Sequence, residues 1–197
     1  WNMGKKISID SSNLMNKLLE LIEAHRLFSF NPIKYEIIIH PQSLIHAIVV
    51  FKNGQSKFLY HETDMKIPIS NAIYNNKVDI DKIVKTNNNF INNLKNISFE
   101  NVDKKRFPIV TLATEKYLSK SGPIILNASN EILVDSFLKN KIPYNGIFET
   151  LKRVFKDRDF NKYAVKKVPN IDEIYKIDNW ARNKTLEIIF KKYEKYK

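Results

Sequence analysis

The sequence predicts a mixed α+β (α/β) fold, in which a partial α/β domain is followed by a linker and a small C-terminal helical bundle. Apolar residues first recur at helical spacing, then form short β-branched runs around an Asn-Gly dipeptide, and later recur at helical spacing again. Hydrophobic residues make up 43% of the 197 residues, which is enough to form a buried core. We expect the α/β part over residues 1–74, the linker over 75–105 and the helical domain over 106–197.

The first long helix is predicted to begin at Ser11 or Ser12, either of which can accept a hydrogen bond from a free backbone N–H as its N-cap. Its apolar face is formed by residues at helical spacing, namely Leu14, Leu18, Leu21 and Ile22. Asn16, Lys17 and Glu20 are three or four residues apart and therefore share the polar face. The free N–H groups and the dipole of such a helix start also suit a phosphate group.

Three short strands are predicted next, over residues 35–39, 44–51 and 55–60. Asn53-Gly54 predicts a tight hairpin between the last two, because this dipeptide readily supplies two positive-φ positions. Residues 67–74 suggest a short helix that the chain enters through Pro68. The expected linker that follows is rich in Asn, Lys and Asp, with one short amphipathic segment over 78–84.

The helical domain is predicted to contain four or so helices. Pro108 suits a first helical position and opens a helix over 109–119, which Gly122-Pro123 should end. Further helices are expected from residue 125 or 127 to 140, over 144–155 and over 171–193. Short polar connections between them are typical of a small bundle.

Charge and composition limit the possible functions. The formal net charge of +12 invites a nucleic-acid hypothesis, but the lysines are spread along the chain without a compact basic block. We therefore expect small anionic ligands and no nucleic-acid partner. The chain lacks cysteine, any G-x-G-x-x-G pattern, any signal peptide and any apolar run of the roughly 18 residues that span a membrane. Because it opens with Trp1, we expect it to be the second half of a longer protein.

Several short blocks together carry a family resemblance. In chain order they are Trp1-Asn2-Met3-Gly4, the helix over 11–20, Ile22-Glu23-Ala24-His25, His40-Pro41-Gln42-Ser43, Asp64-Met65-Lys66-Ile67-Pro68-Ile69 and Leu126-Asn127-Ala128-Ser129-Asn130-Glu131. These blocks resemble the 1-deoxy-D-xylulose 5-phosphate reductoisomerase family, whose members depend on NADPH and a divalent metal in non-mevalonate isoprenoid synthesis. The resemblance implies the conversion of that sugar phosphate to 2-C-methyl-D-erythritol 4-phosphate. It also implies a homodimer when intact, in a bacterial-type cytoplasm or a plastid.

The resemblance assigns residues to the substrate and the metal. By position, Ser11, Asn16 and Lys17 match the group that holds the substrate phosphate. Glu20 matches one of three carboxylates that hold Mg²⁺ or Mn²⁺ beside the substrate, and the other two are expected upstream in an Asp-x-Glu segment. Trp1 matches a flap that closes over the substrate.

Two further residues match positions near NADPH, namely Gly4 by its backbone and Met65 by its side chain. One departure is Leu18, which stands where the family usually has glycine.

Simpler interpretations stay open: Ser11 as a cap, Lys17 as a solvated cation and His40 as a structural residue. Three further residues are expected to lock the helical domain onto its neighbour, namely Asn127, Asn130 and Glu131. For the whole chain, a basic polyanion-binding module or a non-catalytic helical interaction module also stays open.

Overall fold

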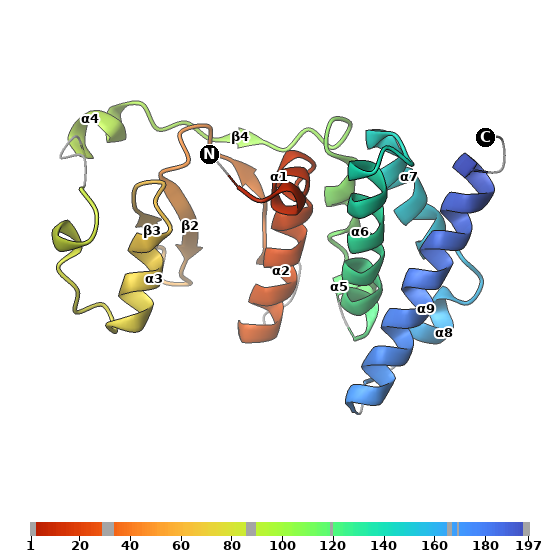
Figure 1. Ribbon diagram of the computed structural model, residues 1–197. Helices are drawn as coiled ribbons and strands as arrows, with labels where there is room; N and C mark the ends of the chain where they lie inside the picture. The colour runs from red at the N-terminus through yellow and green to blue at the C-terminus, as the bar shows by residue number, and fades with distance from the viewer. Residues whose placement is uncertain are drawn as a thin grey trace. The chain divides into compact units, whose positions relative to one another are not determined.

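The computed structural model describes residues 3–28, 34–85, 90–118, 120–164, 167–168 and 170–194. The chain forms two compact units (Figure 1). One comprises Trp1–Glu36 and Asp103–Lys197 and is helical, and the other comprises Ile37–Val102 and contains the strands. The predicted mixed fold class is confirmed, because helices dominate and two small sheets accompany them.

The helical unit places α6 at its centre. In order, its elements are α1 (Lys5–Ser12), α2 (Met15–Phe28), the 3-10 turn η3 (Pro108–Leu112), α5 (Glu115–Leu118), α6 (Gly122–Leu138), α7 (Tyr144–Phe155), α8 (Phe160–Ala164), α9 (Ile171–Ile189) and the π-turn η4 (Phe190–Glu194). Helix α6 packs against α1 and α2 from the start of the chain, and against α7 and α9 from its end (Figure 1).

The core of this unit explains why the two ends of the chain meet. Met15 and Leu18 of α2 are completely buried in one hydrophobic cluster with α6 residues such as Ile125 and Leu133. Burying such side chains is the main favourable term in folding. The apolar stripe of α2 therefore packs against the C-terminal helices, whereas we had expected residues 1–74 to belong together. The helical period of apolar residues predicts that this face of α2 is buried, but it does not identify the helices against which the face packs.

The start of α2 differs from the prediction. Ser11 and Ser12 are not its N-cap, because they form the last turn of the separate helix α1. The first N–H of α2 is bound instead by the side chain of Asn13, whose Oδ1 accepts a hydrogen bond from the Met15 N–H at 2.9 Å. Leu14, between them, has a left-handed backbone with φ of +65°. The chain thus turns sharply from α1 into α2, a corner that we call the α1–α2 corner (residues 10–15).

The second unit contains β1 (Ile38–Ile39), β2 (Ile45–Val50), β3 (Ser56–Tyr60), α3 (Lys66–Ile73), the 3-10 turn η2 (Ile80–Lys82), α4 (Phe90–Lys95) and β4 (Glu100–Asn101). Strands β2 and β3 form the predicted antiparallel hairpin, and β1 pairs antiparallel with β4. At the hairpin turn Gly54 has φ of +86°, but Asn53 does not have a positive φ. The loop is therefore a longer turn with one left-handed glycine, not the expected two-residue turn.

Residues 75–105 are more structured than the expected linker, because η2, α4 and β4 belong to this unit. Later in the chain, α7 has the predicted bounds, whereas Gly122-Pro123 begins a helix instead of ending one. Proline is tolerated there because N–H groups in a first helical turn have no partner within the helix. Among the described residues, none of the helices is both long and apolar enough to cross a membrane.

Candidate functional site

The polar face of α2 brings three of the expected site residues together. Lys17 Nζ donates to the two carboxylate oxygens of Glu20 at 2.9 and 3.1 Å. The two side chains are 42% and 53% exposed, so the pair faces solvent and contributes little to stability. Both charged groups therefore remain available to a ligand.

Asn16, on the same helix, is one of several residues with a buried polar atom that has no partner among the described residues. Its Oδ1 atom is buried and accepts no hydrogen bond from the part of the chain that the structure describes. Buried polar atoms in folded proteins are normally hydrogen-bonded, so this atom marks a place where a ligand or a water can bind. Rotating the amide by half a turn exchanges its oxygen and its NH2 group, so the side chain can equally offer a donor to an anion.

Ser11 lies in the last turn of α1, within the α1–α2 corner. It is half-buried, and both its neighbours are anchored: Asp10 to Asn130 of α6 at 2.8 Å, and Ser12 to Tyr144 of α7 at 2.9 Å. Sequence reasoning missed Asp10 and Tyr144 as contributors to this region. A buried aspartate gives no periodic signal, and its partner lies 120 residues away.

The remaining expected residues are not part of this group. Trp1 lies outside the described residues. Gly4 caps the start of α1 with an ordinary φ of −59°, and an added Cβ there would meet no described atom within 4 Å. Met65 belongs to the second unit, where it precedes α3 and is 54% exposed. His40 also lies there, with Nδ1 2.9 Å from the Ser98 carbonyl oxygen, which fits the structural interpretation.

On the polar face of α2, the carboxylate of Glu20 is the expected ligand of a metal ion. Among the described residues no three His, Asp or Glu side chains gather as a metal site would require. Glu20 has the hard oxygen donors that Mg²⁺ and Mn²⁺ prefer, and it is exposed. It can therefore supply one ligand of a site whose other ligands come from elsewhere.

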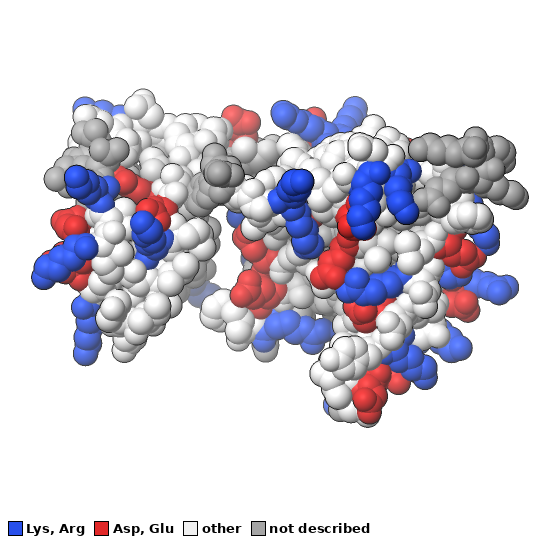
Figure 2. All heavy atoms as spheres, in the orientation of Figure 1, with Lys and Arg blue, Asp and Glu red and all other residues white. Residues whose placement is uncertain are grey.

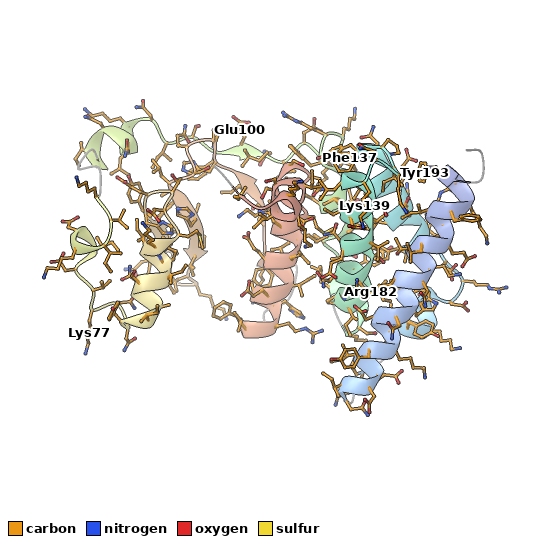
Figure 3. The ribbon with its side chains drawn as sticks, viewed as in Figure 1. Lys77, Glu100, Phe137, Lys139, Arg182 and Tyr193 are labelled. Atoms are coloured by element: carbon orange, nitrogen blue, oxygen red, sulfur yellow. The ribbon has the colours of Figure 1, made fainter. Side chains whose placement is uncertain are left out.

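Of the three residues expected to lock the helical domain onto its neighbour, only Asn130 bonds to a described segment before residue 75, whereas Asn127 bonds to Glu131 on α6 itself and Glu131 bonds to α9. Asn130 joins α6 to α1, and Glu131 of α6 accepts a 2.5 Å hydrogen bond from Arg182, which extends from α9 toward α6 (Figure 3). The Arg182 guanidinium holds the pKa of Glu131 below its ordinary value, mainly through this hydrogen bond. Arg182 also binds Asp178 one turn earlier on α9 at 2.6 Å, and this bond fixes the guanidinium that joins α9 to Glu131 of α6.

On the face drawn in Figure 2, the described cations of each unit are interspersed with acidic side chains. A protein that tracks a nucleic-acid backbone usually gathers its cations in one patch or stripe.

Taken together, the fold and the polar face define a helical unit that presents a candidate anion-binding surface beside the exposed carboxylate of Glu20. Residues 61–184 match the model of the DXP reductoisomerase C-terminal domain, and residues 1–28 match that of the 1-deoxy-D-xylulose 5-phosphate reductoisomerase C-terminal domain. The chain belongs to the 1-deoxy-D-xylulose 5-phosphate reductoisomerase family.

Individual relatives agree with this assignment. The chain is 43% identical over 185 residues to the 1-deoxy-D-xylulose 5-phosphate reductoisomerase of Pelagibacter ubique, covering 92% of this chain and 46% of that protein. It is 39% identical to the enzyme of the Wolbachia of Brugia malayi, covering 100% of this chain and 49% of the relative. The chain thus spans about half the length of these relatives.

Solved structures give the same answer. A DOX-P reductoisomerase in complex with NADPH, fosmidomycin and magnesium superposes with a TM-score of 0.87 at 31% identity, over 96% of this chain and 47% of that one. The Zymomonas mobilis enzyme in complex with NADPH gives 0.81 at 33% identity, over 93% and 47%.

Proposed function

We propose that this chain forms the part of a 1-deoxy-D-xylulose 5-phosphate reductoisomerase that holds the substrate phosphate and one ligand of the catalytic metal. The enzyme would convert its substrate to 2-C-methyl-D-erythritol 4-phosphate in non-mevalonate isoprenoid synthesis, as a homodimer. Family membership supports the reaction. The observation that carries the site is the buried, unpartnered amide oxygen of Asn16 beside the exposed pair of Lys17 and Glu20.

The chemistry of these side chains suits a phosphate. A dianion takes directional hydrogen bonds from the Ser11 hydroxyl and the Asn16 amide, and it attracts the compact charge of the Lys17 ammonium. Lys17 now binds Glu20, and this exposed pair is weak enough to open. Once Lys17 turns to the phosphate, the Glu20 carboxylate becomes free for a cation.

The remaining roles follow family membership. Glu20 would hold Mg²⁺ or Mn²⁺, Trp1 would close over the substrate, and Gly4 and Met65 would contact NADPH. When bound, the metal would act as a Lewis acid on substrate oxygens, and NADPH would supply the hydride. Because the chain spans about half the length of its relatives, the rest of the NADPH and metal sites would lie in the other half of such an enzyme.

The test compares two glutamates of α2 in an enzyme of the relatives' length. Glu20→Gln removes the charge that binds the cation, so activity should disappear and Mn²⁺ binding should weaken. Lys17→Ala should mainly raise KM for the sugar phosphate. Glu23→Gln, an exposed position on the same helix, is the matched control and should behave like the parent enzyme. Unchanged kinetics in both site variants would refute the proposal.

A second measurement uses the 197-residue chain alone. With a single metal ligand and half of the relatives' length, it should not oxidise NADPH in the presence of the sugar phosphate and Mn²⁺. Substantial turnover would contradict the proposed division of the site.

A further inference from the structure

The phosphate-binding residue Ser11 lies between two residues that are held by other helices. On one side, Asp10 is only 3% exposed, and Asn130 of α6 is fully buried. Asn130 Nδ2 donates to Asp10 Oδ1 at 2.8 Å, and Lys6 Nζ donates to Asp10 Oδ2 at the same distance. Both carboxylate oxygens of Asp10 are thus bound, and one of the bonds crosses from α1 to α6.

On the other side of Ser11, Ser12 contacts the first residue of α7. Ser12 Oγ donates its hydrogen to the Ile9 carbonyl at 2.8 Å, so the Tyr144 hydroxyl is the donor in its 2.9 Å bond to Ser12 Oγ. Tyr144 is 40% exposed, and its hydroxyl reaches α1 from the edge of the bundle. The last turn of α1 is therefore fixed from two directions.

The backbone of residues 13–15, which follows α1, has little conformational freedom to compensate for a displacement of that helix. Leu14 holds a left-handed conformation, which is unfavourable for a leucine and persists only where its surroundings impose it. Asn13 closes the first turn of α2. A displacement of α1 would therefore change the position of Ser11 relative to Asn16 and Lys17 on α2.

We propose that Asn130 and Tyr144 are positioning residues for the phosphate: they hold Asp10 and Ser12 against α6 and α7 and thereby fix the Ser11 hydroxyl relative to the phosphate-binding face of α2. This inference rests on the proposed function. It assigns the C-terminal helices a part in substrate affinity, although neither positioning residue touches the substrate. A hydroxyl displaced by as little as an ångström loses most of a directional hydrogen bond, so the effect falls on phosphate affinity.

The experiment uses an enzyme of the relatives' length and measures kcat, KM for the sugar phosphate, KM for NADPH and competitive inhibition by inorganic phosphate. Asn130→Ala should raise KM for the sugar phosphate and the inhibition constant of phosphate by about tenfold, the usual worth of a hydrogen bond to a charged group. Both kcat and KM for NADPH should stay within about twofold. Asn127→Ala removes an amide from the same helix without a bond to α1, and it should leave phosphate affinity unchanged.

Tyr144→Phe tests the same inference at a partly exposed residue, and it keeps the test valid if the Asn130→Ala protein does not fold. It removes one hydroxyl from a partly exposed ring, so the protein should fold normally and show a smaller rise, of about threefold, in the same two constants. A fall in kcat with both constants unchanged would mean that the two residues only stabilise the fold, and it would overturn the inference.

Ser11→Ala separates this inference from the function on which it rests. If Ser11→Ala leaves phosphate affinity unchanged, the proposed phosphate site itself fails. If Ser11→Ala weakens phosphate binding while Asn130→Ala and Tyr144→Phe do not, the site stands and the positioning role is refuted.

Discussion

Leu18 offers the sharpest test of how the site is held in place. Its side chain is completely buried in the core that joins α2 to the C-terminal helices. Leu18→Ala removes three buried carbon groups at roughly 0.8 kcal/mol each, or about 2.4 kcal/mol. The cavity left behind raises the expected loss of unfolding free energy to about 3–5 kcal/mol. That loss is a large fraction of the total stability of a small domain.

Urea titration of the 197-residue chain, followed by circular dichroism, measures this loss. Leu27→Ala is the matched control, because Leu27 lies on the same helix but is 68% exposed, and its change should stay within about 0.5 kcal/mol. Equal shifts in the two variants, or a loss below about 1 kcal/mol for Leu18→Ala, would refute the packing of α2 into the helical core.

Two further predictions concern the helical unit. Gly122→Ala should destabilise the fold by about 1–3 kcal/mol in thermal unfolding, because the added Cβ would lie 2.5 Å from the Tyr117 carbonyl oxygen. The pKa of Glu131 is held below its ordinary value by Arg182, so the stability that this carboxylate contributes is present above that ordinary value, about 4.3, and is lost as the pH falls through the lowered one. Arg182→Met should therefore reduce the loss of unfolding free energy as the pH falls below the ordinary pKa of a glutamate.

The predictions for Gly122→Ala and Arg182→Met can each be contradicted by experiment. Gly4→Ala should leave the melting temperature nearly unchanged, since the new Cβ would meet no described atom within 4 Å; a drop as large as that of Gly122→Ala would contradict the steric argument. For Arg182→Met, a pH dependence identical to that of the parent chain would show that the hydrogen bond to Glu131 does not form in solution.

Local sequence signals predicted the elements whose geometry is set by near neighbours. The bounds of α7 follow from its 3.6-residue apolar period and from Pro143 before it. The β2–β3 hairpin follows from two short apolar runs separated by a turn that contains Gly54. The family resemblance was also correct, because several short blocks in a fixed order are far more specific than one alone.

Other elements were mispredicted where two local interpretations compete. Gly122-Pro123 can end one helix or begin another, and the choice depends on the close approach of α6 to the Tyr117 backbone. Ser11 and Ser12 are good N-cap residues, yet they close α1, because the preceding residues form a helix of their own. Such ambiguities are decided by contacts that a local pattern does not contain.

The sequence by itself determined that Asn16, Lys17 and Glu20 share one face, because residues three and four apart on a helix are neighbours whatever surrounds them. Only the tertiary structure decided what that helix packs against, and that Asn130 binds Asp10 across 120 residues of chain. Local spacing is fixed by backbone geometry, whereas distant partners are chosen by the burial of apolar faces and by the need of each buried charge for a hydrogen bond.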